Sequence, residues 1–261
     1  MKDLTLVIPA KNEPESLPYV LMELEKLDLN FLIVLEKTDF ITINAIEKFK
    51  SKIIFQVNKG YGDAILLGIK NVKTEYFSIF NADGSFDPYE LKNMYNEIKN
   101  NSLDLLLASR YKKDASSEDD TLVTFVGNKI FTLIGKIFFK LPISDILYTY
   151  VMGNTQKILK LDLKQKDFTL CVELPIKAKR NSLKMADISA NEKSRIGGTK
   201  KVNAFKDGFL ILLHMIKLFL NNENLIENFI AKGKVSNFKA EIIKNIALEK
   251  TNFNFFADKT D

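Results

Sequence analysis

The sequence predicts an α/β protein with a mostly parallel central sheet and helices on both faces. Over residues 1–110, short β-rich runs alternate with longer amphipathic segments. Strands that alternate with helices pair in parallel through right-handed crossovers. The runs are almost continuously apolar, which is typical of strands in a sheet covered on both sides. A polar turn follows each run, as in α/β sheets that bind ligands at the carboxyl ends of their strands.

The elements are assigned from these runs and their spacing. β-Branched and aromatic residues predict strands at LTLVIP (4–9), FLIV (31–34), KIIFQV (52–57), YFSIF (76–80) and LDLLLAS (103–109). The amphipathic segments between them predict helices over 15–27, 41–50, 61–73 and 88–100. Polar residues fill 111–125, where we expect a mobile loop that a bound substrate could order.

Composition limits the kinds of site that the chain can build. It has 261 residues, 46% of them apolar, enough for one large α/β domain with or without an appendage. A single cysteine, Cys171, excludes an intramolecular disulfide, and with one histidine it leaves little for a zinc cage. We therefore expect any metal to be held by oxygen atoms.

Neither the N-terminal segment nor the apolar run near the C-terminus indicates export or a membrane span. MKDLTLVIPA lacks a secretory signal pattern, so we expect a cytoplasmic protein. The longest apolar run noted, FLILLHMIKLFL (209–220), contains His and Lys and is shorter than the roughly 20 residues that a span needs. We therefore expect no spanning helix.

Positive charge is concentrated in one part of the chain. The net charge is +5, and residues 157–206 hold thirteen Lys or Arg against five Asp or Glu. Such a segment suits a phosphorylated substrate, an anionic membrane or nucleic acid, or is simply a lysine-rich surface. No nucleic-acid-binding motif accompanies it, so we expect no nucleic-acid partner.

Polar turns follow the predicted strands in succession. They read AKNEPES, LEKTD, NKGYGDA and NADGSFDP, and the last strand ends in SRY. Because the carboxyl ends of parallel strands meet at one edge of the sheet, these turns should share one crevice. The sequence therefore predicts an active site there.

The first and third turns each allow a structural and a functional interpretation. In AKNEPES, Asn12 or Glu13 can cap a helix with Pro14 in its first turn, or can contact a base or ribose. In NKGYGDA, Gly60 and Gly62 form either a tight turn or an anion site at a helix N-terminus. Neither a G-x-G-x-x-G fingerprint nor a phosphate-binding P-loop is present.

NADGSFDP places two carboxylates around a glycine. Asp83 and Asp87 are oxygen ligands of the type that Mg²⁺ or Mn²⁺ accepts beside a diphosphate. Asp87 is also predicted to be the N-cap of a helix whose first residue is Pro88. Both roles can hold together.

Two further segments with candidate functions lie in the second half of the chain. EKSRIGGTKK (192–201) is either an ordinary exposed loop or a cationic loop that closes over a diphosphate. The segment 204–220 has an apolar helical face, which fits a core helix or an interfacial helix on a membrane.

Taken in order, these motifs resemble family 2 glycosyltransferases of the GT-A fold, similar to dolichyl-phosphate mannose synthase and related polyprenyl-phosphate glycosyltransferases. The resemblance rests on LVIPAKNEPESL, NKGYGDAILLGI, FNADGSFDP, ASRY, SDILYTYVMGNT and EKSRIGGTKK, and covers about residues 4–220. It implies a Rossmann-like nucleotide-sugar-binding domain over 1–203 and a C-terminal amphipathic helical appendage over 204–261, which can lie on a membrane.

The resemblance also implies roles for individual residues. Asp83, Asp145 and Arg195 would be catalytic, with Asp145 close to the reacting centre, and Asp83 and Asp87 would hold Mg²⁺ or Mn²⁺. The residues expected to bind substrate are Pro9, Lys11, Asn12, Glu13, Glu36, Lys59, Gly60, Gly62, Asn81, Arg110 and Lys200.

The sequence departs from the family pattern at two acids. LEKT stands where the family usually has an Asp pair, leaving Glu36, and Asn81 replaces the first Asp of D-x-D. Asn offers an oxygen without charge, so we expect weaker metal binding or greater dependence on the substrate diphosphate.

The expected partners are a nucleotide sugar and a polyprenyl phosphate or other acceptor, with a membrane surface nearby. The expected reaction is an inverting displacement at the anomeric carbon. An ionised lipid phosphate needs no general base, whereas a hydroxyl acceptor would need one, for which Asp145 is the candidate. Two alternatives stay open: a degenerate protein that binds a nucleotide sugar without turnover, and a nucleotidyltransferase, which would be expected to carry a Gly-rich, Arg-containing first loop.

Overall fold

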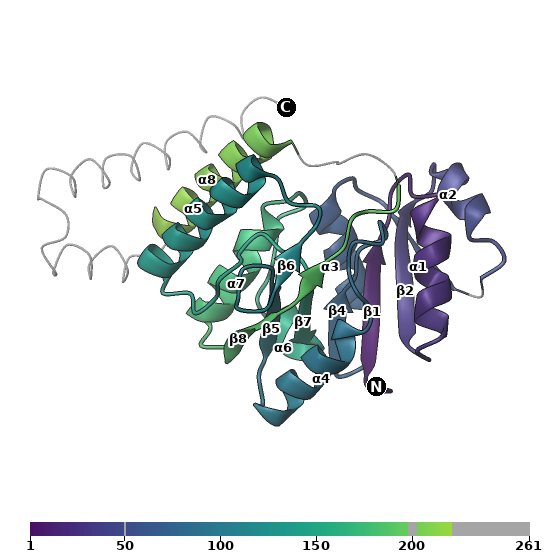
Figure 1. Cartoon of the computed structure of the whole chain (residues 1–261), viewed down its shortest axis with the longest axis horizontal. Coiled ribbons are helices and arrows are strands. Elements are labelled where there is room, and N and C mark those ends of the chain that lie inside the picture. The colour runs from purple at the N-terminus through teal and green to yellow at the C-terminus, as the bar shows by residue number, and fades with distance from the viewer. Residues whose placement is uncertain (50, 198–202, 221–261) are drawn as a thin grey trace, which may run out of the picture. The chain divides into compact units, whose positions relative to one another are not determined.

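The protein is built on a seven-stranded sheet, shown in Figure 1. The computed structural model describes residues 1–49, 51–197 and 203–220. The strand order is β3–β2–β1–β4–β7–β5–β8. The bounds are β1 Leu4–Pro9, β2 Asn30–Glu36, β3 Lys52–Gln56, β4 Tyr76–Ile79, β5 Leu105–Ser109, β7 Val151–Asn154 and β8 Met185–Ser189.

The sheet is parallel apart from one strand, which confirms the predicted class. β7 lies between β4 and β5 and runs antiparallel to both, with Met152 opposite Ser78 on one side and Leu106 on the other. The remaining pairs are parallel. Because β7 is reversed, its N-terminal end lies at the edge where its neighbours have their C-terminal ends.

Helices connect and cover the strands. They are α1 Ser16–Glu25, α2 Phe40–Ala45, α3 Tyr61–Asn71, α4 Glu90–Asn100, α5 Leu122–Phe139, α6 Thr155–Leu159, α7 Leu170–Arg180 and α8 Ala204–Leu220. All four helices predicted before residue 110 are present. The predicted helix over 41–50 is shorter than expected and ends at Ala45, and α4 begins two residues after Pro88.

Both sheet faces are packed, which explains the nearly continuous apolar strands. Leu4, Leu6 and Ile8 of β1 belong to one buried cluster with residues of α1 and α4. Val7, which alternates with them, faces α3 on the other side, where it lies against Gly68. The core therefore fixes β1 and β4 in the centre of the sheet and places their polar C-terminal turns side by side.

The segment 111–125 is more ordered than the mobile loop that the sequence predicts. Ser116–Ser117 form β6, which pairs in parallel with β9 at Asn191–Glu192. Beyond this pair, the Glu118 backbone N–H donates to the Glu192 carbonyl at 3.0 Å. The segment is thus hydrogen-bonded to the start of the EKSRIGG motif, and α5 begins inside it.

α5 is a long apolar helix that the sequence analysis did not assign. Within the described part of the chain, Leu122–Phe139 is the single helix long and apolar enough to cross a membrane by length and composition. The expectation of no such helix, based on 209–220, overlooked this segment. Its inner side carries Asn128 and Thr132, which are buried and hydrogen-bonded to the rest of the domain.

The C-terminal part divides from the rest inside α8. The helix predicted over 204–220 is present as α8, and the chain divides into two compact units after Ile211. A boundary at 203/204 and an appendage to residue 261 stay predictions, because 221–261 lie outside the described residues.

Candidate active site

A cavity of about 420 Å³ lies at the carboxyl edge of the sheet. Its wall takes one or more residues from the end of each successive strand. They are Glu36 at the end of β2, Pro9 and Lys11 at β1, Asn81 and Asp83 after β4, Tyr148 before β7 and Arg110 after β5. Glu192 of β9, the strand that follows β8 in the chain, completes the wall. The separate polar turns of the sequence therefore meet in one site, as the parallel topology predicts.

The cavity contains most of the expected substrate and catalytic residues. Those that line it are Pro9, Lys11, Glu13, Glu36, Gly60, Asn81, Asp83, Arg110 and Arg195. Those that do not are Asn12, Lys59, Gly62, Asp87 and Asp145. Lys200 lies outside the described residues.

At the β1 and β2 ends, Lys11 and Glu36 form an ion pair across the cavity wall. Lys11 Nζ lies 2.7 Å from Glu36 Oε1. Asn12 has a left-handed backbone with φ of 52°, and its N–H donates to Asp39 Oδ2 at 2.7 Å. This turn directs Lys11 and Glu13 to the cavity and Asn12 away from it.

The predicted capping of α1 needs correction. α1 begins at Ser16, after Glu15 as N-cap, and no side chain caps a backbone N–H there. Glu13 instead accepts a hydrogen bond from Ser16 Oγ at 2.7 Å. Pro14 precedes the helix, so its first turn starts later than the Asn12 or Glu13 capping pattern implied.

The glycine turn before α3 is required by close backbone contacts. Gly60 has φ of 120°, and a Cβ there would come 2.1 Å from the Lys166 carbonyl oxygen. A Cβ on Gly62 would come 2.5 Å from the Gln165 carbonyl oxygen. Residues 165–167 thus cover this turn, which leaves Gly60 in the cavity wall and Lys59 exposed outside it.

Asp83 and Asn81 have different surroundings at the end of β4. Asp83 Oδ1 accepts from the Ser85 N–H at 3.0 Å and from Ser85 Oγ at 2.7 Å. The Tyr61 hydroxyl donates to Asn81 Oδ1 at 3.0 Å and lies 2.8 Å from Thr149 Oγ1. Asn81 is therefore part of a neutral hydrogen-bonded chain. Asp83 Oδ2, in contrast, lies near the cation of Arg195.

Asp87 has partners different from those of Asp83 and does not line the cavity. Its Oδ1 accepts from the Tyr89 N–H at 3.1 Å and lies 3.3 Å from Lys193 Nζ. Because Tyr89 is the N-cap of α4, Asp87 caps the turn before the helix rather than the helix itself, which corrects the predicted N-cap.

The donor atoms at Asp83 and Asn81 fit a divalent ion that is held mainly by its substrate. In the described residues no group of three or more His, Cys, Asp or Glu side chains could hold a metal by itself. One carboxylate and one amide oxygen are few ligands for a protein-held ion. Mg²⁺ and similar ions commonly bind through one or two carboxylates together with substrate phosphates and water.

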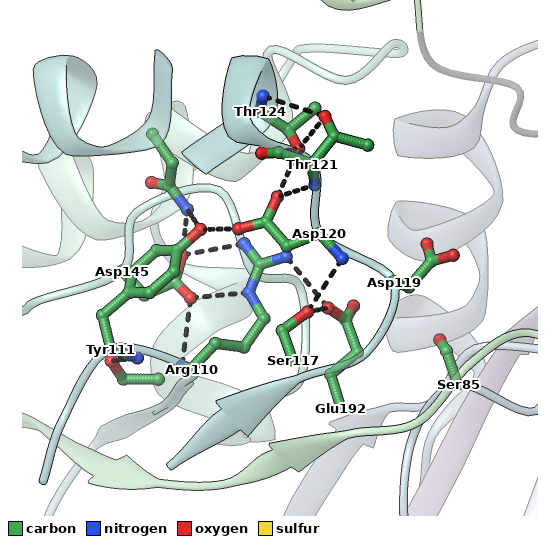
Figure 2. Close-up of polar contacts among 12 residues, drawn as sticks. Ser85, Arg110, Tyr111, Ser117, Asp119, Asp120, Thr121, Thr124, Asp145 and Glu192 are labelled. Carbon is green, nitrogen blue, oxygen red and sulfur yellow. Dashed lines mark hydrogen bonds and ion pairs between the residues drawn. The ribbon is translucent and has the colours of Figure 1, made fainter. Parts of the chain in front are cut away.

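Arg110 is held in a buried ionic network, shown in Figure 2. Its Nε and Nη2 donate to Asp145 Oδ2 and Oδ1 at 2.8 and 3.2 Å, and Nη1 donates to Glu192 Oε2 at 3.2 Å. Asn128 of α5 also donates to Asp145. Burial opposes the Arg110 charge, but Asp145 and Glu192 outweigh it and raise its pKa.

Asp145 is buried against Arg110 and does not line the cavity. Its side chain has no exposed surface, and its oxygens accept from Arg110 and Asn128. This geometry suits a residue that positions Arg110, and the expected place of Asp145 close to the reacting centre stays a prediction.

Glu192 joins the cavity to the segment that carries β6. Its carboxylate accepts from Ser117 as well as from Arg110 (Figure 2). Burial raises the pKa of Glu192 above its ordinary value, against the opposing effect of the Arg110 charge.

Arg195 lies between two carboxylates. Its Nη2 is 3.6 Å from Asp83 Oδ2 and 3.1 Å from Asp119 Oδ2, and its Nε is 3.4 Å from Asp119 Oδ1. The Ile196 N–H donates to the Asp83 carbonyl at 2.9 Å, which holds this segment against the NADGSFDP turn. The cation predicted to contact a diphosphate is thus next to Asp83.

Several residues of the site were not identified from the sequence. Tyr61, Tyr148 and Glu192 line the cavity, and Asp119 pairs with Arg195, which also lines it. Glu192 opens the EKSRIGG motif, and Tyr148 lies inside SDILYTYVMGNT, so proximity to a motif was the available signal.

Sequence comparison places the chain among glycosyltransferases. The family model described as Glycosyl transferase family 2 matches residues 5–161. An uncharacterised glycosyltransferase of Mycobacterium tuberculosis is 24% identical over 209 residues, which are 80% of this chain and 94% of the relative. The UDP-N-acetylglucosamine–dolichyl-phosphate N-acetylglucosaminyltransferase of Methanococcus voltae is 26% identical over 174 residues, covering 60% of this chain and 66% of that enzyme.

Solved structures share the fold. Glucosyl-3-phosphoglycerate synthase from M. tuberculosis, crystallised with Mn²⁺, UDP and glucosyl-3-phosphoglycerate, gives a TM-score of 0.65 at 12% identity, covering 81% of this chain and 79% of that one. Mannosyl-3-phosphoglycerate synthase from Rubrobacter xylanophilus gives 0.62 at 12% identity, covering 90% and 76%. With the family model matching more than half of the chain and the GT-A architecture shared, this protein belongs to glycosyl transferase family 2.

Proposed function

We propose that this glycosyltransferase moves a sugar from a nucleotide-sugar donor to a polyprenyl phosphate, with a divalent metal and inversion at the anomeric carbon. The observation that carries the proposal is the order of side chains across the sheet edge. Lys11 and Glu36 lie at one end, Asp83 and Arg195 in the middle, and Arg110 towards the other end. This order suits a nucleoside, a diphosphate and an acceptor in succession.

In the proposed reaction a phosphate oxygen of the acceptor attacks the anomeric carbon. The bond from that carbon to the diphosphate oxygen breaks, and a nucleoside diphosphate leaves. Arg195, 3.6 Å from Asp83, would stabilise the negative charge that develops on the leaving group. A divalent ion bound through Asp83, Asn81 and the diphosphate would supply further electrophilic stabilisation.

The acceptor in this proposal is already ionised and needs no base. This agrees with the position of Asp145, which is buried against Arg110 and does not line the cavity. Arg110 lines the cavity and is held by two carboxylates, so it can present its cation to an acceptor phosphate without moving.

A lipid acceptor is supported by the outer side of α5. The exposed apolar residues of α5 are Leu122, Val123, Phe125, Val126, Ile130, Leu133 and Ile137, which we call the α5 apolar stripe. Exposed Lys129 and Lys136 lie along one side of it at helical spacing. Such a face suits the boundary of an anionic membrane. We infer that α5, in addition to the proposed interfacial role of 204–220, holds the enzyme at the cytoplasmic membrane surface.

The proposal is tested by measuring nucleoside diphosphate release from UDP- and GDP-sugars with a polyprenyl phosphate and Mn²⁺ or Mg²⁺. We expect release with one donor, dependent on both acceptor and metal, and loss of release in Asp83→Ala. If nucleoside diphosphate is released with 3-phosphoglycerate instead of the polyprenyl phosphate, the proposed acceptor is wrong but the proposed glycosyl transfer stands.

A degenerate binding protein is the competing function, favoured by the neutral Asn81 and its bond to Tyr61. Tight binding of a nucleotide sugar without release under every combination would support it. Pyrophosphate formation from a nucleoside triphosphate and a sugar phosphate would instead identify a nucleotidyltransferase.

A further inference from the structure

Tyr148 occupies the cavity wall between the diphosphate and acceptor ends. It immediately precedes β7, which lies between β4 with Asp83 and β5 with Arg110. Its ring is fixed on two sides, since the Arg110 guanidinium carbon lies 4.6 Å from the ring centroid and the Phe86 ring 5.0 Å. These two contacts orient the ring in the cavity wall.

The Tyr148 hydroxyl is buried without a hydrogen-bond partner among the described residues. Only 3% of the residue is exposed, although it lines the cavity. Tyr150, two residues along, differs: its hydroxyl donates to the Asp87 carbonyl at 2.9 Å. Tyr61, across the cavity, is likewise bonded, to Asn81.

A buried hydroxyl without a partner is costly, and native structures rarely keep one that nothing satisfies. Burial, followed by the nearby Glu192 carboxylate, raises the pKa of Tyr148, so the hydroxyl remains protonated at neutral pH. It can thus donate one hydrogen bond to a ligand oxygen and accept another.

The order of side chains along the sheet edge indicates which part of a ligand would lie nearest to the Tyr148 hydroxyl. If Asp83 and Arg195 contact the donor diphosphate, the group bonded to that diphosphate extends one strand further, to β7. In a nucleotide sugar this group is the sugar that is transferred.

We propose that the Tyr148 hydroxyl hydrogen-bonds an oxygen of the transferred sugar, and so helps to select the donor. This inference rests on the proposed function. Asp83 and Arg195 would recognise the diphosphate that all donors share, whereas Tyr148 contacts the part in which they differ. A site that hydrogen-bonds a substrate hydroxyl rejects an analogue that lacks it more strongly than a purely apolar site can.

The test compares Tyr148→Phe with wild type by isothermal titration calorimetry in Mn²⁺. The probes are UDP and GDP, and UDP-glucose, UDP-N-acetylglucosamine and GDP-mannose. We expect the Kd of the bare diphosphate to stay within about twofold and the Kd of the preferred nucleotide sugar to rise about tenfold. The thermal midpoint of the ligand-free variant should equal or exceed that of wild type, because no bond is lost.

Tyr150→Phe is the matched control. It removes a bonded hydroxyl from a fully buried ring outside the cavity, so it should lower the thermal midpoint and leave the ratio of the two Kd values unchanged. Unchanged Kd values for both the diphosphate and the nucleotide sugar in Tyr148→Phe would overturn the inference and leave a structural hydroxyl. Equal weakening of diphosphate and nucleotide sugar would overturn it in favour of a diphosphate contact.

The proposed function can fail separately. If wild type binds none of the five nucleotides, the donor assignment falls before the variants are compared, and the inference falls with it. If wild type binds a nucleotide sugar but the variant keeps the ratio, only the Tyr148 inference is wrong.

Discussion

Arg110 and Asp145 form a buried two-bond ion pair, with Nε to Oδ2 at 2.8 Å and Nη2 to Oδ1 at 3.2 Å. The pair joins the end of β5 to the chain before β7, on the cavity side of α5. The pair therefore contributes to the stability of the domain and also fixes the position of the Arg110 guanidinium in the cavity wall.

Asp145→Asn should destabilise the protein by about 3 kcal/mol, because removing one partner of a buried pair leaves the other charge uncompensated. Glu192 retains part of the compensation. Chemical denaturation measures the loss. Asp162→Asn, which breaks the exposed pair with Lys164, should leave stability almost unchanged. Equal losses in the two variants would contradict the buried role.

Glu192 should make stability depend on pH in a definite direction. Burial raises its folded-state pKa above the ordinary 4.5, so the folded state binds more protons than the unfolded state between the two values. The contribution of this group is therefore full below about 4.5 and is lost as pH rises through the raised pKa. The unfolding free energy of wild type minus that of Glu192→Gln should fall over this window in denaturation series. A difference that rises with pH would contradict the stated shift.

Asp119→Asn should tighten nucleoside diphosphate binding about fivefold, because a carboxylate that competes with the ligand for Arg195 is neutralised. Glu118→Gln is the matched control, since Glu118 accepts from Ser194 rather than from Arg195. Titration calorimetry with UDP or GDP measures both. Weaker binding in Asp119→Asn alone would instead show that Asp119 is needed to orient Arg195.

Asn81→Asp should increase Mn²⁺ affinity about tenfold in the presence of UDP or GDP, because it adds a charged oxygen ligand next to Asp83. Electron paramagnetic resonance of free Mn²⁺ measures binding without turnover. Asp83→Asn should weaken it, and Asp87→Asn should leave it unchanged, since Asp87 faces Lys193 outside the cavity. A loss in Asp87→Asn equal to that in Asp83→Asn would restore Asp87 as a ligand.

Ile130→Asp or Leu133→Asp in the α5 apolar stripe should each lower partitioning onto anionic vesicles about tenfold, because each removes a large apolar side chain from the lipid boundary. Ile41→Asp, at an exposed apolar position of α2, should leave partitioning unchanged. Flotation with phosphatidylserine vesicles provides the measurement. If the wild-type protein does not float with the vesicles, the proposed membrane association is wrong.

Sequence patterns were sufficient for the elements up to residue 110 and for much of the site. Period, turn chemistry and parallel topology placed Lys11, Glu36, Asn81 and Asp83 at one sheet edge, where the structure has them. The strands β7 and β8 and the helix α5 were not assigned. β7 is short and reversed, and α5 exposes apolar residues while it buries Asn128 and Thr132, so neither gives the periodic signal of an alternating α/β unit.

Asp145 and Tyr148 show why some residues could not be interpreted from sequence. The same motif contains both, yet one is sealed behind Arg110 and the other lines the cavity. Which of two neighbouring side chains faces a cavity depends on partners that are distant along the chain, such as Asn128 and Glu192.

By itself, the sequence determined the α/β class, the edge of the sheet that carries the site and the resemblance to family 2 glycosyltransferases, because strand period and turn composition are local properties. Only the tertiary structure decided that Asp145 is buried against Arg110, that Asp87 pairs with Lys193 outside the cavity lining and that the Tyr148 hydroxyl has no partner among the described residues. Those outcomes depend on burial and on hydrogen bonds between distant segments, which no local pattern encodes.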